Sequence, residues 1–246
     1  MSFRAARRAV ALGIALFRCI LLYWWRRLRG PLTLERRALW LQAACQLILS
    51  SLEIEYRFDG TPPKRGLIVA NHLSYLDILI LSAMTPCFFV AKAEIASWPY
   101  FGEAARSGGT IFIDRGSLAS AEKVAALIAE RLLLPVPTLF FPEGTSSDGS
   151  SVSRFHTRLF EPAIRAGMPI TAAAIRYKLI GGAAERELCW FGDGPFLPHL
   201  WKTLGVEGFI AHVYFGESKL YFDRRAAASS SRQEIVAMRT EELAQR

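Results

Sequence analysis

The sequence predicts an α/β fold with a mainly parallel sheet flanked by helices, and two observations carry this prediction. From residue 52 onward, short apolar runs of strand length alternate with stretches in which apolar residues recur at helical spacing. The chain of 246 residues is also 52% hydrophobic and only 21% charged. It is therefore long and apolar enough to bury a core, and it lacks the composition of a disordered protein.

The predicted elements follow one another along the chain from residue 52. Strands are expected over 52–58, 66–71, 87–92, 110–114, 138–141, 169–177, 187–192 and 209–216. Helices are expected over 75–84, 98–106, 118–134, 157–166 and 232–245. Ser231 and Glu234 have the spacing of a capping box, which predicts the start of the last helix. Because sites in such sheets form beyond the carboxyl ends of strands, functional residues are expected after Ala70, Ile113 and Phe141.

The basic surplus of the chain lies entirely at its N-terminus. The net charge is +8, and residues 1–37 contain nine arginines, no lysine and a single acidic residue, Glu35. The remainder is neutral, which argues against a nucleic-acid partner and indicates a local, anionic partner for the first segment. The four cysteines lie far apart without a C-x-x-C pair. We therefore expect neither a disulfide scaffold nor a zinc ribbon.

Residues 1–50 are predicted to form a membrane-associating helical hairpin ahead of an α/β domain at 51–246. The stretch 9–25 is apolar except for Arg18. A cleavable signal peptide is excluded, because no small-residue cleavage site follows. Crossing the bilayer is marginal, since a spanning helix needs about 20 apolar residues and Arg18 lies near the centre of this shorter stretch.

A helix lying in the membrane interface fits the N-terminal pattern better. At helical spacing, several arginines share one arc of the helix and a broad apolar face lies beside it. These arginines are Arg4, Arg7, Arg8, Arg18, Arg26 and Arg29. Such a helix would bind a bilayer with anionic headgroups. Gly30-Pro31 ends it, and a second apolar helix over 34–49 completes the hairpin. The alternative is a helix pair packed on the protein's own core.

The first candidate site is the segment NHLSYLD, residues 71–77. His72 follows a buried strand, and it can meet Asp77 if His72 lies in the turn and Asp77 in the first turn of a helix. A carboxylate on one ring nitrogen fixes the tautomer and makes the other nitrogen a better base. The simpler alternative is that Ser74 and Asp77 form a capping box. Because no G-x-S-x-G or H-E-x-x-H motif is present, a lone base suits direct attack of a substrate hydroxyl on an activated acyl group.

Two further segments follow predicted strands. In GGTIFIDR, residues 108–115, Arg115 can bind a phosphate or carboxylate with its guanidinium, or form a surface turn with Asp114. In FPEGTSSDG, residues 141–149, a strand ends in proline and an acidic residue, and Gly, Thr and Ser follow. Exposed amides and hydroxyls in that loop can cradle a phosphate or an oxyanion. The alternative is an ordinary polar loop.

Together these segments resemble the glycerolipid acyltransferase family, which contains the bacterial 1-acylglycerol-3-phosphate acyltransferases. NHLSYLD matches the family's N-H-x-x-x-x-D motif, GGTIFIDR its G-x-x-F-I-x-R block, and FPEGTSS its F-P-E-G-T-R-S block. KAEIASWPYFG and AGMPITAAAIRY also resemble the family. The matches occur in the right order and cover the chain from about residue 52 to residue 177.

The resemblance implies transfer of a fatty acyl group from a thioester of acyl carrier protein or coenzyme A to the hydroxyl of a lysolipid. It implies an enzyme of lipid biosynthesis at the cytoplasmic face of the inner membrane, with an apolar tunnel for the acyl chain. His72 corresponds to the base and Asp77 to the residue that orients it. Substrate-binding roles are implied for Asn71, Arg115, Glu143, Gly144 and Thr145. No cofactor or metal is required, because the thioester supplies its own leaving group. A hydrolase with the same base is the alternative.

The sequence departs from the family's pattern in the third block. Ser146 stands where the family usually has arginine, and His156 stands where an F-K pair is common. One cation fewer in a phosphate-binding loop weakens the case for a phosphatidic-acid-forming enzyme. The FPEGTSSDG variant and the tract around Trp190 to Trp201 resemble lyso-ornithine-lipid acyltransferases. The acceptor is therefore left open between lysophosphatidic acid and an amino-acid-containing lysolipid.

Overall fold

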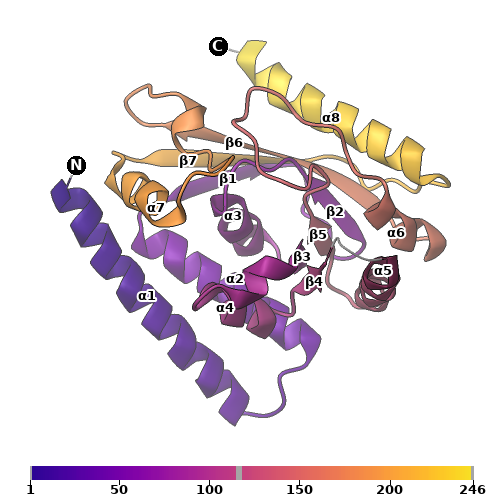
Figure 1. Ribbon diagram of the computed structural model, residues 1–246, viewed down its shortest axis with the longest axis horizontal. Coiled ribbons are helices and arrows are strands. Elements are labelled where there is room, and N and C mark those ends of the chain that lie inside the picture. Colours follow the sequence, from indigo (N-terminus) through magenta and orange to yellow (C-terminus); the bar gives the residue numbers. More distant parts are fainter. Residues whose placement is uncertain (1, 115–117, 245–246) are drawn as a thin grey trace.

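A computed structural model describes residues 2–114 and 118–244 of the protein as a seven-stranded sheet with helices on both faces (Figure 1). The strands are β1 (Glu55–Asp59), β2 (Leu67–Ala70), β3 (Phe88–Lys92), β4 (Ile111–Ile113), β5 (Thr138–Phe140), β6 (Ile170–Leu179) and β7 (Phe209–Phe215). Their order in the sheet is β1-β7-β6-β2-β5-β3-β4. β6 and β7 are antiparallel, and the other neighbouring pairs are parallel. The predicted mainly parallel sheet is confirmed.

The helices form two layers, and the alternation of side chains along each strand supplies a core to both. In β2, Ile68 and Ala70 pack toward α2 (Leu34–Ser51) and α3 (Leu76–Met84), whereas Leu67 and Val69 face the opposite layer. That opposite layer consists of α5 (Leu118–Leu132), α6 (Glu161–Arg165) and α8 (Arg224–Ala244). A strand buried on both faces has no polar side, which is why β2 is an uninterrupted apolar run. The remaining elements are η1 (Ala93–Ser97), α4 (Phe101–Gly108), η2 (Arg158–Phe160) and η3 (Glu185–Glu187).

The N-terminal hairpin packs on the body of the protein with one side. α1 (Ser2–Leu28) lies against α2 and α7 (Phe196–Gly205) and buries Ala5, Ala15 and Cys19. Arg8 is buried, and its guanidinium donates to the carbonyls of Val206 at 2.8 Å and Glu207 at 3.2 Å, just beyond the end of α7. The alternative of packing on the protein's own core therefore holds for this side of the hairpin.

The predicted basic stripe is wrong for Arg7 and Arg8, and Arg4 also contacts the body of the protein through a 3.5 Å hydrogen bond to the Gly205 carbonyl. Arg8 binds the carbonyls beyond α7, and Arg7 forms a two-pronged hydrogen bond with Glu53, with distances of 3.1 and 2.6 Å. Both side chains serve the contact between α1 and the body, because carbonyl groups at a helix end and a nearby carboxylate attract guanidinium groups. Arg18 and Arg29 are exposed, as the prediction requires.

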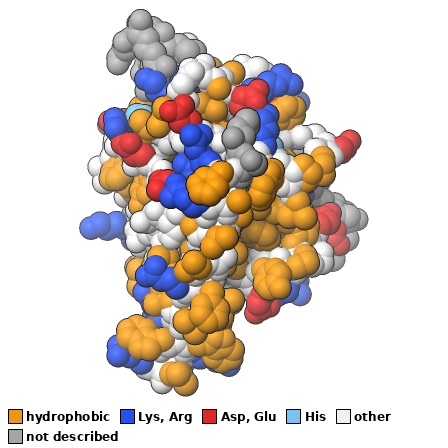
Figure 2. All heavy atoms as spheres, turned by 90° about the vertical axis from the view of Figure 1, so that its left-hand side faces the viewer, with side chains coloured by type: hydrophobic (Ala, Val, Ile, Leu, Met, Phe, Trp, Pro, Cys, Tyr) orange, Lys and Arg blue, Asp and Glu red, His pale blue; other side chains and the backbone are white. Residues whose placement is uncertain are grey.

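The other side of α1 is exposed and apolar. Most of its exposed large hydrophobic residues recur at helical spacing; they are Phe3, Val10, Ile14, Phe17, Ile20, Leu21, Trp24, Trp25 and Leu28. Figure 2 faces this side of the molecule and shows hydrophobic side chains gathered together with basic ones among them. Arg27 and Arg29 stack over the rings of Trp24 and Trp25. Within the described residues, no helix has both the length and the hydropathy that crossing a bilayer requires.

Two expected elements near the C-terminus differ from the structure. Residues 187–192 do not form a strand. The N–H groups of Glu187, Leu188 and Cys189 close a turn onto residues 184–186, and the Trp190 N–H donates to the Leu73 carbonyl at 2.9 Å. α8 begins at Arg224 and not at residue 232. Asp223 caps it by accepting from the N–H groups of Arg225 and Ala226, so the predicted Ser231–Glu234 capping box lies inside the helix.

α7 was not predicted. Pro198 lies in its first turn, where a proline is tolerated because the N–H it lacks would have no partner within the helix. α7 matters for the site, because it packs against α1 and α3.

Candidate active site

His72 lies directly after β2 at the carboxyl edge of the sheet, where it meets Asp77 from the first turn of α3. Its Nδ1 is 2.6 Å from Asp77 Oδ2, so the predicted contact is present. The His72 ring stacks on Phe141, with centroids 4.0 Å apart and planes 9° apart. The His72 side chain keeps 19% of its surface exposed, whereas that of Asp77 is fully buried. The pair thus combines an accessible imidazole with an enclosed carboxylate.

The Asp77 carboxylate also closes the start of α3. Oδ2 accepts from the backbone N–H groups of Leu73 at 2.7 Å and Ser74 at 3.0 Å. The same oxygen therefore makes the dyad contact and the Asp77 half of the predicted capping box, whereas the Ser74 hydroxyl has no hydrogen-bond partner among the described residues and the other half of the box does not form. Because an ionised carboxylate only accepts hydrogen bonds, we assign the His72 proton to Nδ1. That leaves Nε2 as the ring nitrogen with a free lone pair for a substrate proton.

The second carboxylate oxygen of Asp77 is held by a residue that the sequence patterns did not indicate. Tyr177, from β6, donates its hydroxyl to Asp77 Oδ1. Burial, together with the charge of the adjacent Asp77, raises the pKa of Tyr177 well above its usual range. Tyr177 therefore stays a protonated hydrogen-bond donor. The sequence signal that could have pointed to Tyr177 is its position at the end of the predicted strand 169–177.

The loop after β5 is fastened to His72 through Glu143. This residue is buried, and its two carboxylate oxygens accept from the backbone N–H groups of His72 at 2.8 Å and Ser153 at 2.7 Å. Burial raises the pKa of Glu143. The Ser147 N–H donates in turn to the His72 carbonyl at 2.9 Å. β2 and β5 are neighbours in the sheet, which brings these two distant segments together.

The remaining predicted site residues fall into three groups. Asn71 is buried, and its amide exchanges two hydrogen bonds with the backbone of Ile175, at 2.8 and 3.1 Å, which ties the end of β2 to β6. Gly144 is partly exposed and Thr145 is exposed on the loop after Glu143, and Gly144 has a φ of +78° that suits glycine. Arg115 lies outside the described residues.

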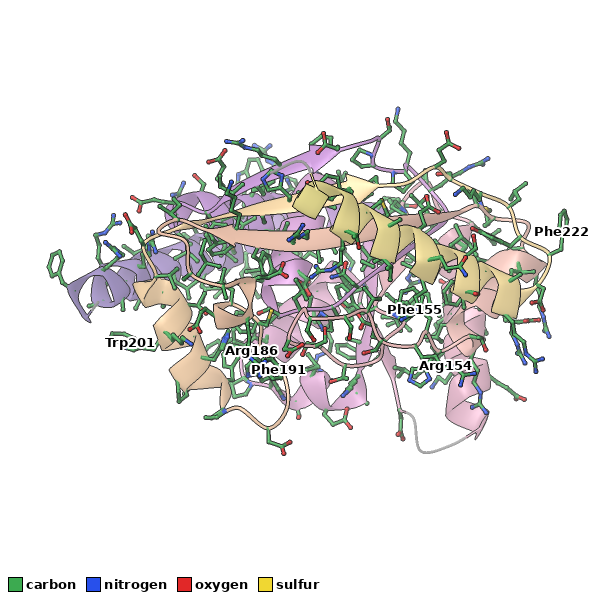
Figure 3. All side chains as sticks on the ribbon, turned by 90° about the horizontal axis from the view of Figure 1, so that it is seen from above. Arg154, Phe155, Arg186, Phe191, Trp201 and Phe222 are labelled. Carbon is green, nitrogen blue, oxygen red and sulfur yellow. The ribbon has the colours of Figure 1, made fainter. Side chains whose placement is uncertain are left out.

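One acid and one base border the site, contributed by two loops. Asp148 forms an ion pair with Arg186 at 2.7 Å, and the Arg186 guanidinium lies 5.0 Å from the Phe191 ring centre (Figure 3). Ser146, at the position where the family usually has arginine, donates its hydroxyl to the Trp190 carbonyl. The two loops are thus joined beside His72, with opposite charges on their outer side.

A small apolar cavity of about 60 Å³ lies between α1, α2, α3 and α7. Its lining includes Leu12, Leu16, Ile48, Leu76 and Leu200, and Tyr75 from the motif that contains His72. The cavity therefore lies beneath the N-terminal hairpin and against the first turn of α3, the helix that begins just after the His72 turn.

A half-buried histidine on α7, His199, contacts Tyr75 of the cavity lining without belonging to the dyad. The Tyr75 hydroxyl is 3.2 Å from His199 Nδ1, and His199 Nε2 is 3.1 Å from the Cys189 carbonyl. Since a carbonyl only accepts, Nε2 carries the proton and Nδ1 accepts from Tyr75. Burial lowers the pKa of His199 and raises that of Tyr75 to about 12. No three His, Cys, Asp or Glu side chains of the described residues are grouped so that they could hold a metal ion.

Comparison with known proteins places this geometry among acyl-transferring enzymes. A family model described as "Acyltransferase" matches residues 53–176. A lyso-ornithine lipid O-acyltransferase of Pseudomonas aeruginosa is 35% identical over 209 residues, covering 83% of this chain and 78% of that protein. A 1-acyl-sn-glycerol-3-phosphate acyltransferase of Neisseria meningitidis is 34% identical over 172 residues, covering 68% and 67% of the two chains.

A solved structure has the same fold across nearly the whole chain. The crystal structure of the 1-acyl-sn-glycerophosphate acyltransferase PlsC from Thermotoga maritima superposes with a TM-score of 0.68 at 17% identity. The superposition covers 99% of this chain and 98% of that one, so the α1–α2 hairpin is included in the shared fold.

Proposed function

The chain belongs to the acyltransferase family, and from that premise we propose that it moves a fatty acyl group from a thioester to the free hydroxyl of a lysolipid. The observation that carries the proposal is the contact between His72 and Asp77 at the carboxyl end of β2. This contact supplies a base with a defined tautomer, and a base is the group that acylation of a hydroxyl requires.

In the proposed reaction, His72 Nε2 takes the proton of the acceptor hydroxyl as its oxygen attacks the thioester carbonyl carbon. The carbon–sulfur bond then breaks, and the imidazolium returns the proton to the departing thiolate. Asp77 stabilises the imidazolium during the step through the 2.6 Å contact. A positioned base contributes about 10²–10⁴-fold to the rate, so orientation and stabilisation of the oxyanion must supply the rest.

We assign the acyl chain to the apolar cavity beside Tyr75. The cavity is lined by leucine and isoleucine side chains and by Tyr75 and Leu76, which lie between His72 and Asp77 in the sequence, and this suits an acyl chain whose carbonyl extends toward His72. Its volume of about 60 Å³ is small beside the 300–1,000 Å³ of typical ligand sites. A long acyl chain would therefore enter only as the helices around the cavity separate.

For the acceptor we favour a lysolipid with an amino-acid headgroup, of the lyso-ornithine type. Such a headgroup carries an ammonium and a carboxylate, and the loops beside His72 present one acid and one base, Asp148 and Arg186. A phosphate headgroup calls for several cations, and Ser146 replaces one of them. Arg115, Gly144 and Thr145 are proposed to contact the acceptor headgroup by the family resemblance. Glu143 and Asn71 would support it indirectly, because their polar groups are engaged with backbone.

The exposed side of α1 supports a location at a membrane surface. It combines apolar residues with Arg18, Arg26, Arg27 and Arg29, and such a helix binds at the boundary of anionic headgroups and acyl chains. A lysolipid acceptor resides in that boundary. We propose that α1 lies in the interface and brings the dyad close to its lipid substrate.

The experiment is product analysis with the purified full-length chain. It receives labelled acyl-coenzyme A or acyl-carrier protein together with lyso-ornithine lipid or lysophosphatidic acid, and the lipids are separated and counted. We expect labelled diacyl lipid in proportion to thioester consumed, with lyso-ornithine lipid the better acceptor. Free fatty acid released without diacyl product would identify a hydrolase and overturn the proposal. Better use of lysophosphatidic acid would overturn the choice of acceptor alone.

A further inference from the structure

The rear of the dyad contains a residue with no role in the reaction described so far. Tyr177 and Asp77 are both buried, and the Tyr177 hydroxyl donates to Asp77 Oδ1, the oxygen that faces away from His72. We propose that Tyr177 is a positioning residue for acyl transfer, which fixes the rotation of the Asp77 carboxylate and so the placement of the His72 ring. This inference rests on the proposed function of the site.

The need for such a residue follows from the freedom of a carboxylate. The torsion that turns an aspartate carboxylate is broad, so contacts on one oxygen alone hold it loosely. Asp77 Oδ2 accepts from three groups on one side, namely His72 Nδ1 and the N–H groups of Leu73 and Ser74. A partner for Oδ1 on the opposite side prevents the carboxylate from turning. In a buried site, an oxygen without a partner would be drawn toward any other donor.

Tyr177 is itself held by two contacts, and Arg239 supports one of them. Its backbone N–H donates to Glu185 Oε1 at 2.7 Å, and its ring packs edge-on against Phe209, with centroids 5.6 Å apart. Arg239, from α8, binds Glu185 at 2.8 Å and also donates to the carbonyl of Ile175. Packing and hydrogen bonds therefore hold this end of β6 in place beside the dyad, as a positioning residue requires.

β6 supports the segment around His72 at two points. Ile175 holds Asn71, the residue before His72, through both of its backbone groups. Two positions further along the strand, and on the same face, Tyr177 holds Asp77. One strand therefore fixes the residue before the base and the carboxylate that orients it.

The test is Tyr177→Phe in the full-length protein, assayed for acyl transfer over a range of pH. The ring and its packing on Phe209 are kept, and only the hydroxyl is lost. We expect kcat to fall about tenfold with the KM of both substrates unchanged, as for loss of one hydrogen bond to a charged group. We also expect the acidic limb of the pH–rate profile to move to lower pH, because a carboxylate that turns away stabilises the imidazolium less. In proton NMR, the His72 Nδ1–H signal should broaden.

Tyr221→Phe is the matched control. The Tyr221 hydroxyl donates to Ser230 Oγ at 3.1 Å, away from the dyad, so this variant should keep the wild-type kcat and pH profile. Three results would overturn the proposal: a Tyr177→Phe variant with unchanged kcat and pH profile, one that loses only thermal stability, or one whose acidic limb moves to higher pH with kcat retained. Failure of the proposed function would be recognised separately, since wild-type protein would then form no diacyl lipid.

Discussion

Replacing Asp77 by asparagine removes the charge of the dyad while leaving its shape nearly intact. The amide oxygen can take the place of Oδ2 and accept from His72 Nδ1 and from the N–H groups of Leu73 and Ser74. The amide nitrogen would then face Tyr177, whose hydroxyl can turn to accept from it. Asp77→Ala, by contrast, would leave these buried donors without a partner. A loss of activity in that variant could then come from unfolding and would not measure the role of the carboxylate in catalysis.

The magnitude follows from the charge that the substitution removes. The base carries a positive charge only while it holds the substrate's proton, so the carboxylate acts on the transition state more than on the resting enzyme. Asp77 is fully buried and lies 2.6 Å from His72, so replacing its charge by a neutral amide should raise the activation free energy by about 2–4 kcal/mol. That energy corresponds to a loss of about 30- to 1,000-fold in kcat.

The assay measures initial rates of diacyl lipid formation from a labelled thioester at saturating lysolipid, with thermal unfolding measured on the same samples. We expect Asp77→Asn to unfold near the wild-type temperature and to lose activity within the stated range. A folded Asp77→Asn variant with more than half of the wild-type kcat would refute the reasoning, because the carboxylate would then serve α3 alone.

Three further predictions concern α1, α7 and the membrane face. Arg8→Met should lower the free energy of unfolding by about 1–3 kcal/mol, since the carbonyls beyond α7 lose their donors. Arg18→Met, on the same helix, should change the free energy of unfolding little. Equal effects of the two variants in denaturant melts would contradict this. Burial depresses the pKa of His199, so below about pH 6.5 the unfolded chain binds a proton at this residue more readily than the folded chain does. The free energy of unfolding should therefore fall as the pH falls. His199→Gln should reduce the difference in melting temperature between about pH 7.5 and about pH 5.5. The double variant Phe17→Glu, Leu21→Glu should weaken sedimentation with phosphatidylglycerol vesicles. The control Leu220→Glu, Phe222→Glu changes an exposed apolar pair, of which Phe222 lies far from α1 (Figure 3), and it should sediment like the wild type. Equal sedimentation of the two double variants would contradict the interfacial role of α1.

The fold was largely predictable because its central strands are buried on both faces. β2, β3 and β5 are short apolar runs between turn residues, and such runs leave little choice of structure. The segment 187–192 contains a similar apolar run, yet its first N–H groups form turn bonds to residues 184–186, and the Trp190 N–H donates to the distant Leu73 carbonyl. Periodicity does not contain that information. α8 was placed too late, because alanines and serines obscured a helix start that Asp223 determines.

The site was predictable where its residues are neighbours in sequence. His72 and Asp77 are five residues apart, so the turn and the helix start that join them could be inferred from the motif itself. Tyr177 lies 100 residues beyond Asp77 and reaches it only because β6 pairs with β2. The same holds for Glu143, whose backbone contacts with His72 depend on the pairing of β2 with β5. Contacts across a sheet require its strand order, which no local pattern supplies.

The division of the N-terminal arginines also depends on packing. On a helical wheel, Arg7 and Arg8 belong to the same arc as Arg18, and nothing local separates them. In the folded chain, Glu53 and the carbonyls beyond α7 lie within reach of the first two. The apolar side of α1 is left exposed, and the proposed membrane contact rests on that side.

The most direct test of the account is the rate of acyl transfer by His72→Ala, measured with a labelled thioester and the best lysolipid acceptor. We predict a folded protein whose kcat is lower by about 10²-fold or more, because the imidazole that takes the proton of the acceptor hydroxyl is then missing and the other groups on the Asp77 carboxylate are hydrogen-bond donors. A folded His72→Ala protein that forms diacyl lipid at close to the wild-type rate would contradict the assignment of His72 as the base.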